Sequence, residues 1–202
     1  MSVRADVYIH PSSRSLIETE DIGAGTKIWS NVRILRGARI GADCVIGTNV
    51  FIGRDVRVGD RVKVENGVSL YEGVEAEDGV FFGPHCTTTN DLDPAAITPD
   101  GRLKGPDDWT LGKTLFRQGA RVGAHATIVC GDPLRTIGRW ALIGAHSLVT
   151  HDVPDFALVV GVPARLVRYV CPRSLRHHVA VAASVPRCSE CGDELRAIVS
   201  PR

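Results

Sequence analysis

Residues 28–64 read IWSNVRILRGARIGADCVIGTNVFIGRDVRVGDRVKV, and an aliphatic residue returns at every sixth position. These positions are Ile28, Ile34, Ile40, Ile46, Ile52, Val58 and Val64, and the same register extends back to Ile22 and on to Phe82. A step of six matches neither the roughly 3.6-residue period of a helix nor the two-residue alternation of an ordinary strand. The pattern therefore indicates an internal structural repeat.

Each six-residue unit has room for one short strand and one turn. Three such units would close a triangular coil of about 18 residues, and stacked coils would form parallel sheets about 4.8 Å apart. One aliphatic side chain per side would fill the narrow interior, and Gly, Asn or Asp near the turns would accept a left-handed backbone. The repeat predicts an all-β solenoid of about six triangular coils.

The register is lost over residues 88–114, TTNDLDPAAITPDGRLKGPDDWTLGKT, and resumes at Phe116, Val122 and Ile128. The interrupting segment is rich in Pro, Gly and Asp and has no periodicity. An inserted loop longer than about 15 residues in a compact domain is functional or disordered, and we favour a functional loop. A smaller insertion, of three residues, is expected between Ile128 and Ile137, where nine residues stand in place of six.

Composition narrows the functional classes. The chain has 202 residues, with 24 Lys+Arg against 23 Asp+Glu, and no basic block that would favour nucleic acid as a partner. Its apolar stretches are shorter than the roughly 20 residues needed to cross a bilayer, and its start lacks the apolar core of a signal peptide. We therefore expect a cytoplasmic protein with no membrane partner, whose six cysteines are mostly reduced thiols.

The [Ile/Val]-Gly-x-x-[Val/Ala/Cys]-x unit resembles that of the hexapeptide-repeat acyltransferases. The resemblance covers about residues 8–170 and implies a left-handed parallel β-helix, a handedness that the periodicity itself does not give. Three segments are similar to a subgroup that N-acetylates nucleotide-linked 3-amino sugars, such as UDP-2-acetamido-3-amino-2,3-dideoxy-glucuronate. They are SLYEGVEAEDGVFFGPHCTTTND (69–91), LFRQGARVGAHATIVCG (115–131) and DVPDFALVVGVPARLV (152–167).

The resemblance implies an acetyl-CoA-dependent N-acetyltransferase domain over residues 1–168, with the loop inserted at 88–114, followed by a small appendage over 169–202. It also implies a homotrimer, in which the loop covers a cleft between neighbouring subunits. The acceptor would be the amine of a nucleotide-linked amino sugar, and either UDP or dTDP remains open as the nucleotide. Direct attack is favoured, because Cys86 and Cys130 occupy inner positions of the repeat.

The candidate catalytic residues follow from the subgroup motif and from the chemistry. In the subgroup the asparagine of the TND motif lies at the active site, a role that falls here on Asn90, and Asp91 follows it. An amide positions a substrate but is no general base, whereas histidine is suited to accept the ammonium proton. His85 is our first candidate for that base, although the subgroup usually has a small residue there. Glu72 is an alternative, and the departing sulfur or water is another.

The segment GVPAR at 161–165 resembles the terminal Gly-x-Pro-Ala-[Lys/Arg] segment of the family, which lies beside the coenzyme A nucleotide. The resemblance implies that Pro163 packs near the adenine and that Arg165 or Arg168 pairs with phosphate, for which a planar guanidinium is suited. A backbone N–H near Gly144 or Ala145 is expected to bind the developing oxyanion.

Further basic residues are candidates for contact with the acceptor's nucleotide diphosphate. Arg33 and Arg36 lie on the early coils, where the family holds the nucleotide, and Lys113, Lys104 and Arg102 lie in the inserted loop. The early segment KIWSNVRI lacks a histidine-bearing stretch that is common in relatives, so the resemblance leaves the sugar open.

The C-terminal appendage contains Cys188-x-x-Cys191, a pair with the spacing of a zinc knuckle. Zinc takes about four sulfur or imidazole ligands, so Cys171 and either His177 or His178 would have to complete a structural site. A degenerate ribbon that binds no metal, or a short helix with free thiols, is the alternative.

Three other functions fit parts of the sequence. A trimeric metal-dependent carbonic anhydrase on the same fold would use histidines such as His125, His146 and His151, but it gives Asn90, the loop and GVPAR no role. An O-acetyltransferase would use a hydroxyl acceptor, and a trimeric scaffold would have no activity. Binding of coenzyme A separates the acyltransferases from the other two classes.

Overall fold

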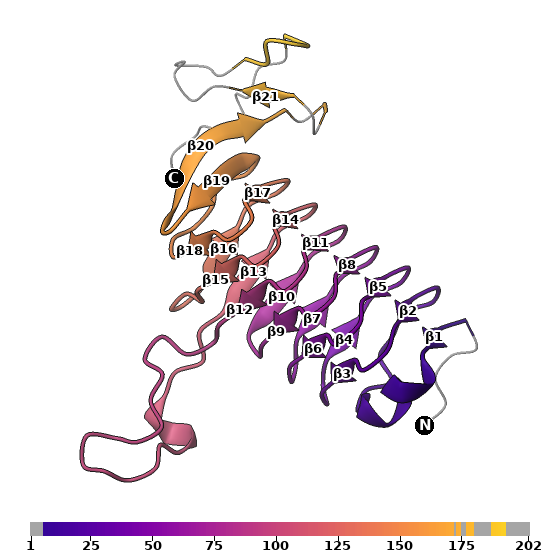
Figure 1. The fold of residues 1–202 in the computed structure, drawn as a ribbon, viewed down its shortest axis with the longest axis vertical. Helices are drawn as coiled ribbons and strands as arrows, with labels where there is room; N and C mark the ends of the chain where they lie inside the picture. The colour runs from indigo at the N-terminus through magenta and orange to yellow at the C-terminus, as the bar shows by residue number, and fades with distance from the viewer. Residues whose placement is uncertain (1–5, 172, 175–176, 180–186, 193–202) are drawn as a thin grey trace.

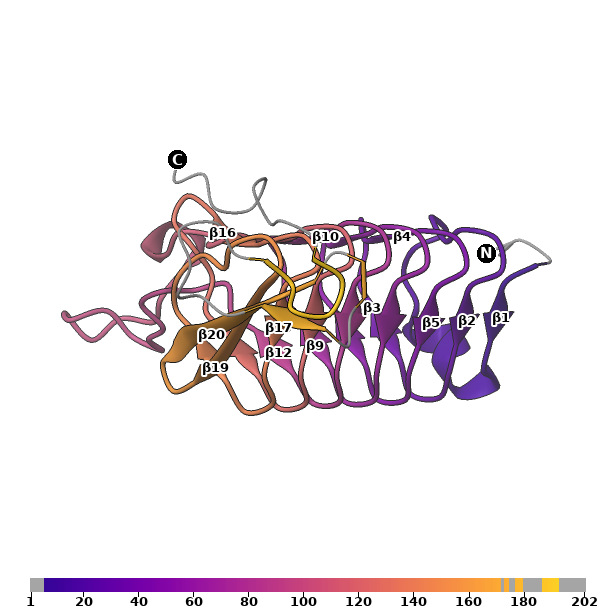
Figure 2. The ribbon, with the colours of Figure 1, turned by 90° about the horizontal axis from the view of Figure 1, so that it is seen from above.

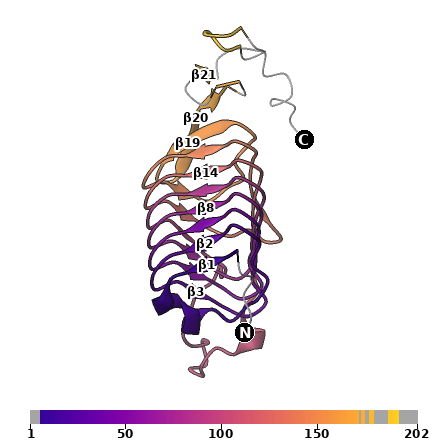
Figure 3. The same ribbon diagram turned by 90° about the vertical axis from the view of Figure 1, so that its right-hand side faces the viewer.

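The chain winds into a parallel β-helix, a rod whose short strands run along three flat faces (Figure 1). The structure is a computed structural model and describes residues 6–171, 173–174, 177–179 and 187–192. The turns stack from β1 at one end to β19 at the other, as Figure 3 shows. The predicted all-β class is confirmed, since the described helices are only the 3-10 turns η1 (Pro11–Leu16) and η2 (Pro106–Asp108).

Each face is one parallel sheet. Face A contains β1 (Tyr8–Ile9), β2 (Lys27–Ile28), β5 (Val45–Ile46), β8 (Lys63–Val64), β11 (Phe81–Phe82), β14 (Arg121–Val122), β17 (Leu142–Ile143) and β19 (Ala157–Gly161). Face B contains β3 (Arg33–Ile34), β6 (Phe51–Ile52), β9 (Ser69–Leu70), β12 (Thr87–Thr88), β15 (Thr127–Ile128) and β18 (Leu148–Val149). Face C contains β4 (Arg39–Ile40), β7 (Arg57–Val58), β10 (Val74–Ala76), β13 (Thr114–Phe116) and β16 (Arg135–Ile137).

The strand register confirms the predicted coil length. On face A, Lys27 pairs with Val45, Val45 with Lys63 and Lys63 with Phe81, so each regular turn consists of three six-residue units. Phe81 then pairs with Arg121, because the inserted loop lengthens that turn. Arg121 pairs with Leu142, three positions beyond the partner that a regular turn would supply. This pairing confirms the smaller insertion predicted between Ile128 and Ile137.

The number of turns differs from the sequence-based prediction. Eight parallel strands follow one another on face A, so the rod has about eight turns rather than six. The first turn contains η1, which breaks the six-residue spacing between the buried residues Ile9 and Ile17. The last turn is shortened, since Leu142 pairs with Leu158, two positions before the partner of a regular turn. Neither irregular turn follows the repeat on which the prediction depended.

The core is a stack of inward side chains along the whole rod, one from each strand and others from the turn residues just before the strands, such as Val32, Ala38 and Cys44. The strand residue that points inward is almost completely buried, as at Ile28, Ile46 and Ile128, each 0% exposed, while its neighbour in the strand faces outward. Phe82 and Phe116 replace aliphatic residues in the turn that carries the loop, and their rings meet edge to face at 4.9 Å. Close stacking also excludes side chains at some glycines, because a Cβ at Gly41 would lie 2.4 Å from the oxygen of Gly59.

Two segments extend beyond the regular turns. The inserted loop, which carries η2, projects away from the rod (Figures 1 and 2). At the C-terminal end, β19 pairs antiparallel with β20 (Ala164–Val170), and β20 with β21 (His178–Val179), so face A continues past the last turn. In the part of the chain that the structure describes, no helix is long and apolar enough to cross a membrane.

The two residues of β2 provide a test of the stacked core. Replacing the buried Ile28 by Ala should lower the free energy of unfolding by about 2–5 kcal/mol, because a cavity cannot be closed between neighbouring turns. Replacing its outward neighbour Lys27 by Ala should change it by less than about 0.5 kcal/mol. Urea denaturation of both variants measures the difference. Equal effects would contradict the assignment of the two faces of this strand.

Candidate functional site

A row of residues, polar except for the buried Cys130, follows the corner between faces B and C. Each member stands two residues after the buried residue of a face B strand, so the strand pairing places successive members one turn apart, about 4.8 Å along the rod. We call this set the B–C row: Arg36, Arg54, Glu72, Asn90, Cys130 and His151. The sequence analysis named Arg36, Glu72 and Asn90 as substrate-binding or catalytic candidates, Cys130 as an inner residue and His151 as a histidine of the carbonic anhydrase alternative.

The inserted loop leaves the rod at this corner and covers part of the row. A cleft of about 770 Å³ lies between them, which we call the loop cleft, and it is lined by Arg54, Glu72, Asn90, Asp91, Ala95, Lys104, Gly105, Pro106 and Trp109. The structure thus brings together the expected Asn90, Glu72 and Asp91, from one corner and the start of the loop.

The backbone of Asn90 is fixed by the base of the loop. Its carbonyl oxygen accepts a hydrogen bond of 2.9 Å from the N–H of Gly112, so the two ends of the loop meet at this residue. Gly112 has no room for a side chain, because a Cβ there would lie 2.3 Å from the sulfur of Cys130. The close approach holds Asn90 at the mouth of the cleft, with its side chain half-buried.

The outer part of the loop is held by charged side chains. The guanidinium of Arg102 donates two hydrogen bonds of 2.6 Å to the carboxylate of Asp108, which also accepts the N–H of Gly105 at 2.7 Å. Lys104 donates to the backbone oxygen of Asp93 at 2.6 Å and lies 3.6 Å from the carboxylate of Asp91. These contacts place Lys104 and Asp91 on the wall of the cleft.

The Arg102 guanidinium lowers the pKa of the Asp108 carboxyl below its usual value. A carboxyl with a lowered pKa in the folded state stabilises that state above its unfolded pKa of about 3.9, and the contribution is lost as the pH falls through the folded pKa. The loop contact is therefore fully formed near neutral pH.

His85 does not lie in the loop cleft of its own chain. It occupies the corner between faces A and B, exposed and with a left-handed backbone of φ 58°. Its ring stacks on that of His125 at 5.0 Å, and His125 stacks on His146 at 4.9 Å, in the next turns. His151 belongs to the other corner of face B, so the three histidines of the carbonic anhydrase alternative do not converge within the chain.

Two residues of the cleft were missed by the sequence analysis. Arg54 stands one full turn after Arg36 and one full turn before Glu72, so a reading of the sequence in steps of three hexads would have found it. Trp109 carries no such signal, because nothing in the sequence of the loop tells which of its residues folds back to the rod. Lys104, expected to meet the nucleotide, does line the cleft.

The other basic candidates lie apart from the loop cleft. Arg33 is exposed on face B and lies 3.7 Å from the carboxylate of Glu18. Arg36 is exposed and begins the B–C row. Lys113 is exposed at the end of the loop, and its backbone pairs with that of Gly131.

The GVPAR segment forms the turn between β19 and β20. Pro163 is exposed in this turn, and Arg165 lines a second hollow of about 330 Å³ with His151, Asp152 and Leu166, together with Val149, Thr150, Val153, Pro154, Val159 and Ala164. This hollow follows the same corner as the loop cleft, and His151 lies two turns beyond Asn90 in the B–C row.

The remaining coenzyme candidates lie on face A and on β20. Arg168 is half-buried on β20, while Ala145 is exposed at the corner that follows β17. The N–H of Gly144 donates to the oxygen of Val159 at 2.8 Å. Because that donor is already used in the face A ladder, it is not available for the expected oxyanion role.

The thiols of the rod are poor nucleophiles. Burial raises the pKa of Cys86 to about 12 and also raises that of Cys44, so both stay protonated near neutral pH. Cys130 is buried as well. The expected metal ligands Cys171, His177, Cys188 and Cys191 form a separate cluster at the C-terminal end, and the side chain of His178 lies outside the described part of the chain.

Residues 21–54 match the family described as bacterial transferase hexapeptide, six repeats. Over these residues the chain is similar to that hexapeptide-repeat family. It is 47% identical over 62 residues to the dTDP-3-amino-3,6-dideoxy-alpha-D-galactopyranose 3-N-acetyltransferase of Aneurinibacillus thermoaerophilus, a match that covers 31% of each chain. It is 44% identical over 64 residues to the serine acetyltransferase of Bacillus subtilis, covering 29% of this chain and 30% of that one. Each match thus spans about a third of the relative's length.

Among solved structures, the chain aligns with a point mutant of AntD, an N-acyltransferase from Bacillus cereus in complex with dTDP and coenzyme A. The TM-score is 0.47 at 19% sequence identity, and the alignment covers 85% of this chain and 81% of that chain.

From the Arg102–Asp108 contact we predict how fast a protease cleaves the loop. Replacing Arg102 by Ala should make thermolysin cleave residues 91–111 faster near neutral pH, because the loop loses both hydrogen bonds to Asp108. Replacing Arg57 by Ala, an exposed residue of face C, is the control and should leave the cleavage rate unchanged. Mass spectrometry of the fragments locates the cut. Equal rates in both variants would show that other contacts hold the loop.

Proposed function

We propose that this protein transfers the acetyl group of acetyl-CoA to the amine of a nucleotide-linked 3-amino sugar. The observation that supports this most strongly is the 47% identity over 62 residues to an enzyme named as a dTDP-3-amino sugar 3-N-acetyltransferase. The loop cleft supports the proposal, because its mixed charges and its volume of about 770 Å³ suit a polar acceptor larger than a free amino acid. Both UDP and dTDP fit this account.

The acceptor binds in the loop cleft. The side chain of Arg54 is exposed at the cleft and makes no hydrogen bond or ion pair with the described residues, so its planar guanidinium is available to a diphosphate. Trp109 offers an aromatic surface to the base or the sugar. The sugar then extends toward Glu72 and Asn90, where the rod meets the base of the loop.

The reaction is a direct attack of nitrogen on the thioester carbonyl. The ammonium group first loses a proton, the C–N bond then forms, the C–S bond breaks, and coenzyme A leaves with a proton on its sulfur. Asn90 binds the amine through its side-chain oxygen and so orients the nitrogen for attack. The carboxylate of Glu72, in the same cleft, accepts the ammonium proton, and the departing thiolate accepts the proton that nitrogen loses after attack.

The donor lies along the same corner of the rod. Arg165 lines the hollow at the C-terminal end and pairs with a phosphate of the coenzyme. Because His151 is two turns from Asn90, about 10 Å along the rod, the pantetheine arm runs beside the B–C row from this hollow to the loop cleft. The high pKa of Cys86 supports transfer without an acyl-enzyme, since its thiolate is scarce near neutral pH.

The protein acts as a homotrimer that packs through face B. From β6 onward the outward residues of this face are partly exposed and uncharged: Phe51, Ser69, Tyr71, Thr87, Thr89, Thr127, Val129, Leu148 and Thr150. Faces A and C carry charges at the same positions, among them Lys27, Lys63, Arg121, Arg57, Glu75 and Arg117. Interface centres are depleted of charge. Packing through face B leaves the loop cleft at its edge, between subunits.

The cysteines of the rod, Cys44, Cys86 and Cys130, are free thiols, which supports a reducing compartment such as the cytoplasm. An O-acetyltransferase is the second candidate, because the chain is also 44% identical over 64 residues to a serine acetyltransferase. The two functions differ in the acceptor atom, nitrogen or oxygen, and are separated by the same assay.

The assay offers acetyl-CoA with UDP- and dTDP-linked 3-amino and 4-amino sugars, and with serine, and follows free thiol release. We expect turnover with a 3-amino sugar. Replacing Asn90 by Ala should lower kcat about 100-fold, because the amine is no longer oriented. Gln118→Ala, which removes an exposed amide outside the cleft, is the control. Turnover with serine alone would favour O-acetylation, and an unchanged rate in Asn90→Ala would reject the role of Asn90.

Two substitutions test the proposed interface, and each adds one charge to a different face. Val129→Arg places a cation at the centre of face B and should convert the trimer into monomers with little activity. Val45→Arg makes the same change on face A and should leave a trimer. Light scattering after size exclusion measures the mass of both variants. Dissociation by Val45→Arg, with an intact trimer in Val129→Arg, would place the interface on face A.

A further inference from the structure

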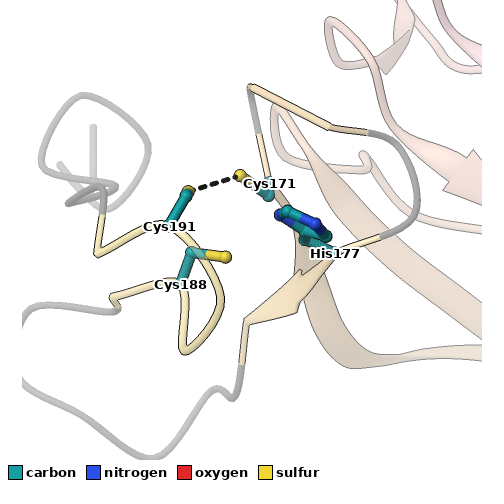
Figure 4. Close-up of side chains that lie close together, drawn as sticks. All are labelled: Cys171, His177, Cys188 and Cys191. Atoms are coloured by element: carbon teal, nitrogen blue, oxygen red, sulfur yellow. Dashed lines mark hydrogen bonds between the residues drawn. The ribbon is translucent and has the colours of Figure 1, made fainter.

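We propose that the C-terminal segment holds a structural zinc ion between Cys171, His177, Cys188 and Cys191. One ligand atom from each of these residues lies within 4.8 Å of all the others (Figure 4). The four residues come from three segments: Cys171 follows β20, His177 precedes β21, and the two remaining cysteines belong to the CSEC turn. The site is independent of the proposed acetyl transfer, since none of these residues lines either hollow of the B–C corner.

The spacing of the ligand atoms matches tetrahedral zinc. With Zn–S bonds of about 2.3 Å, two sulfurs of a tetrahedron lie about 3.8 Å apart. The sulfurs of Cys171 and Cys191 lie 3.5 Å apart, too far for a disulfide bond of about 2.05 Å and close to the separation that zinc imposes. Small shifts of the side chains would bring all four atoms to one ion.

A second observation concerns His177. Its Nδ1 atom is buried and has no hydrogen-bond partner among the described residues. A buried polar atom without a partner costs free energy, and coordination to a metal would remove that cost. The backbone adds to the arrangement, because the N–H of Cys171 donates to the carbonyl oxygen of His177 at 3.2 Å and so ties these two ligands together.

The ligand set indicates zinc and a structural role. Three thiolates and one imidazole are typical of structural zinc sites, which have four protein ligands and leave no position for water or substrate. Cys171 and Cys188 are buried, and Cys191 is partly exposed, so the ion would be shielded from solvent on most sides. A hard cation such as Mg²⁺ would prefer oxygen ligands, and none belongs to this cluster of described residues.

The ion would tie residues 187–192 to the rod. Cys171 directly continues β20, whose other end carries the turn at Pro163 and the exposed Arg165. Cys188 is remote from Cys171 in the sequence, yet its thiol is buried against the core that extends from the rod. Solenoids need their end turns covered, so we infer that the zinc-bound segment serves as the C-terminal cap.

Metal analysis of the full chain tests this site. The protein is purified without chelator and without a metal-affinity step, and elemental analysis should find about one zinc ion per chain. In chain reconstituted with Co²⁺, the visible spectrum should show the strong bands of a tetrahedral thiolate site. A folded chain with no zinc that also binds no Co²⁺ would overturn the proposal. So would a Cys171–Cys191 disulfide found by mass spectrometry.

Variants identify the ligands and separate them from other thiols. Cys188→Ser and His177→Ala should each lose most of the zinc, and His177→Cys should retain it with a four-sulfur set. Cys86→Ala is the matched control, because alanine occupies the same repeat position at Ala38 and Ala126, and it should keep the metal. Loss of zinc from His178→Ala, with retention in His177→Ala, would overturn the assignment of the fourth ligand.

Hydrogen exchange tests the capping role separately from metal binding. Removal of zinc from the wild-type chain should speed amide hydrogen exchange in β20 and in residues 187–192, while β5, β8 and β11 keep their protection. This measurement needs no substitution, so it remains informative if a cysteine variant does not fold. Unchanged exchange at the C-terminal end would overturn the cap, whatever the outcome of the acetyl-transfer assay.

Discussion

The narrow interior of the rod is the constraint on which the rest of the structure depends. Strand residues such as Ile28, Ile46 and Ile128, together with turn residues such as Val32 and Ala38, fill that space. Because successive turns stack at a fixed spacing, a residue lies directly beside its equivalent in the next turn. The place of a residue in the repeat therefore fixes its place on the rod. Side chains at the same repeat position form straight rows along it.

The rows explain how a rigid scaffold presents a site. At one corner of face B they bring Arg54, Glu72 and Asn90 together, and at the other they stack His85 on His125. The loop lengthens one turn without disturbing the register, since it leaves and returns at the same corner, where Gly112 donates to Asn90. Polar residues on such a loop face side chains whose positions the rod has already fixed.

The two ends of the molecule depart from the repeat for a related reason. An end turn has a neighbour on one side only, so its buried surface must be covered by something other than another hexad. At the start, η1 lies between β1 and Ile17, which pairs with Ile34 of face B, and at the end β19, β20 and β21 extend face A. The cluster of Cys171, His177, Cys188 and Cys191 lies on this extension, and so the metal site and the cap are one proposal.

The sequence by itself determined the coil of three hexads, both insertions and the buried face of each strand, because the interior selects aliphatic side chains locally. It also identified Asn90, Glu72 and Asp91 as neighbours, through a motif and the break in the repeat. Only the tertiary structure decided that Lys104 and Trp109 of the loop join them, and that His177 rather than His178 meets the three cysteines. Those contacts join residues outside the repeat, and a local pattern carries no information about how a loop folds back.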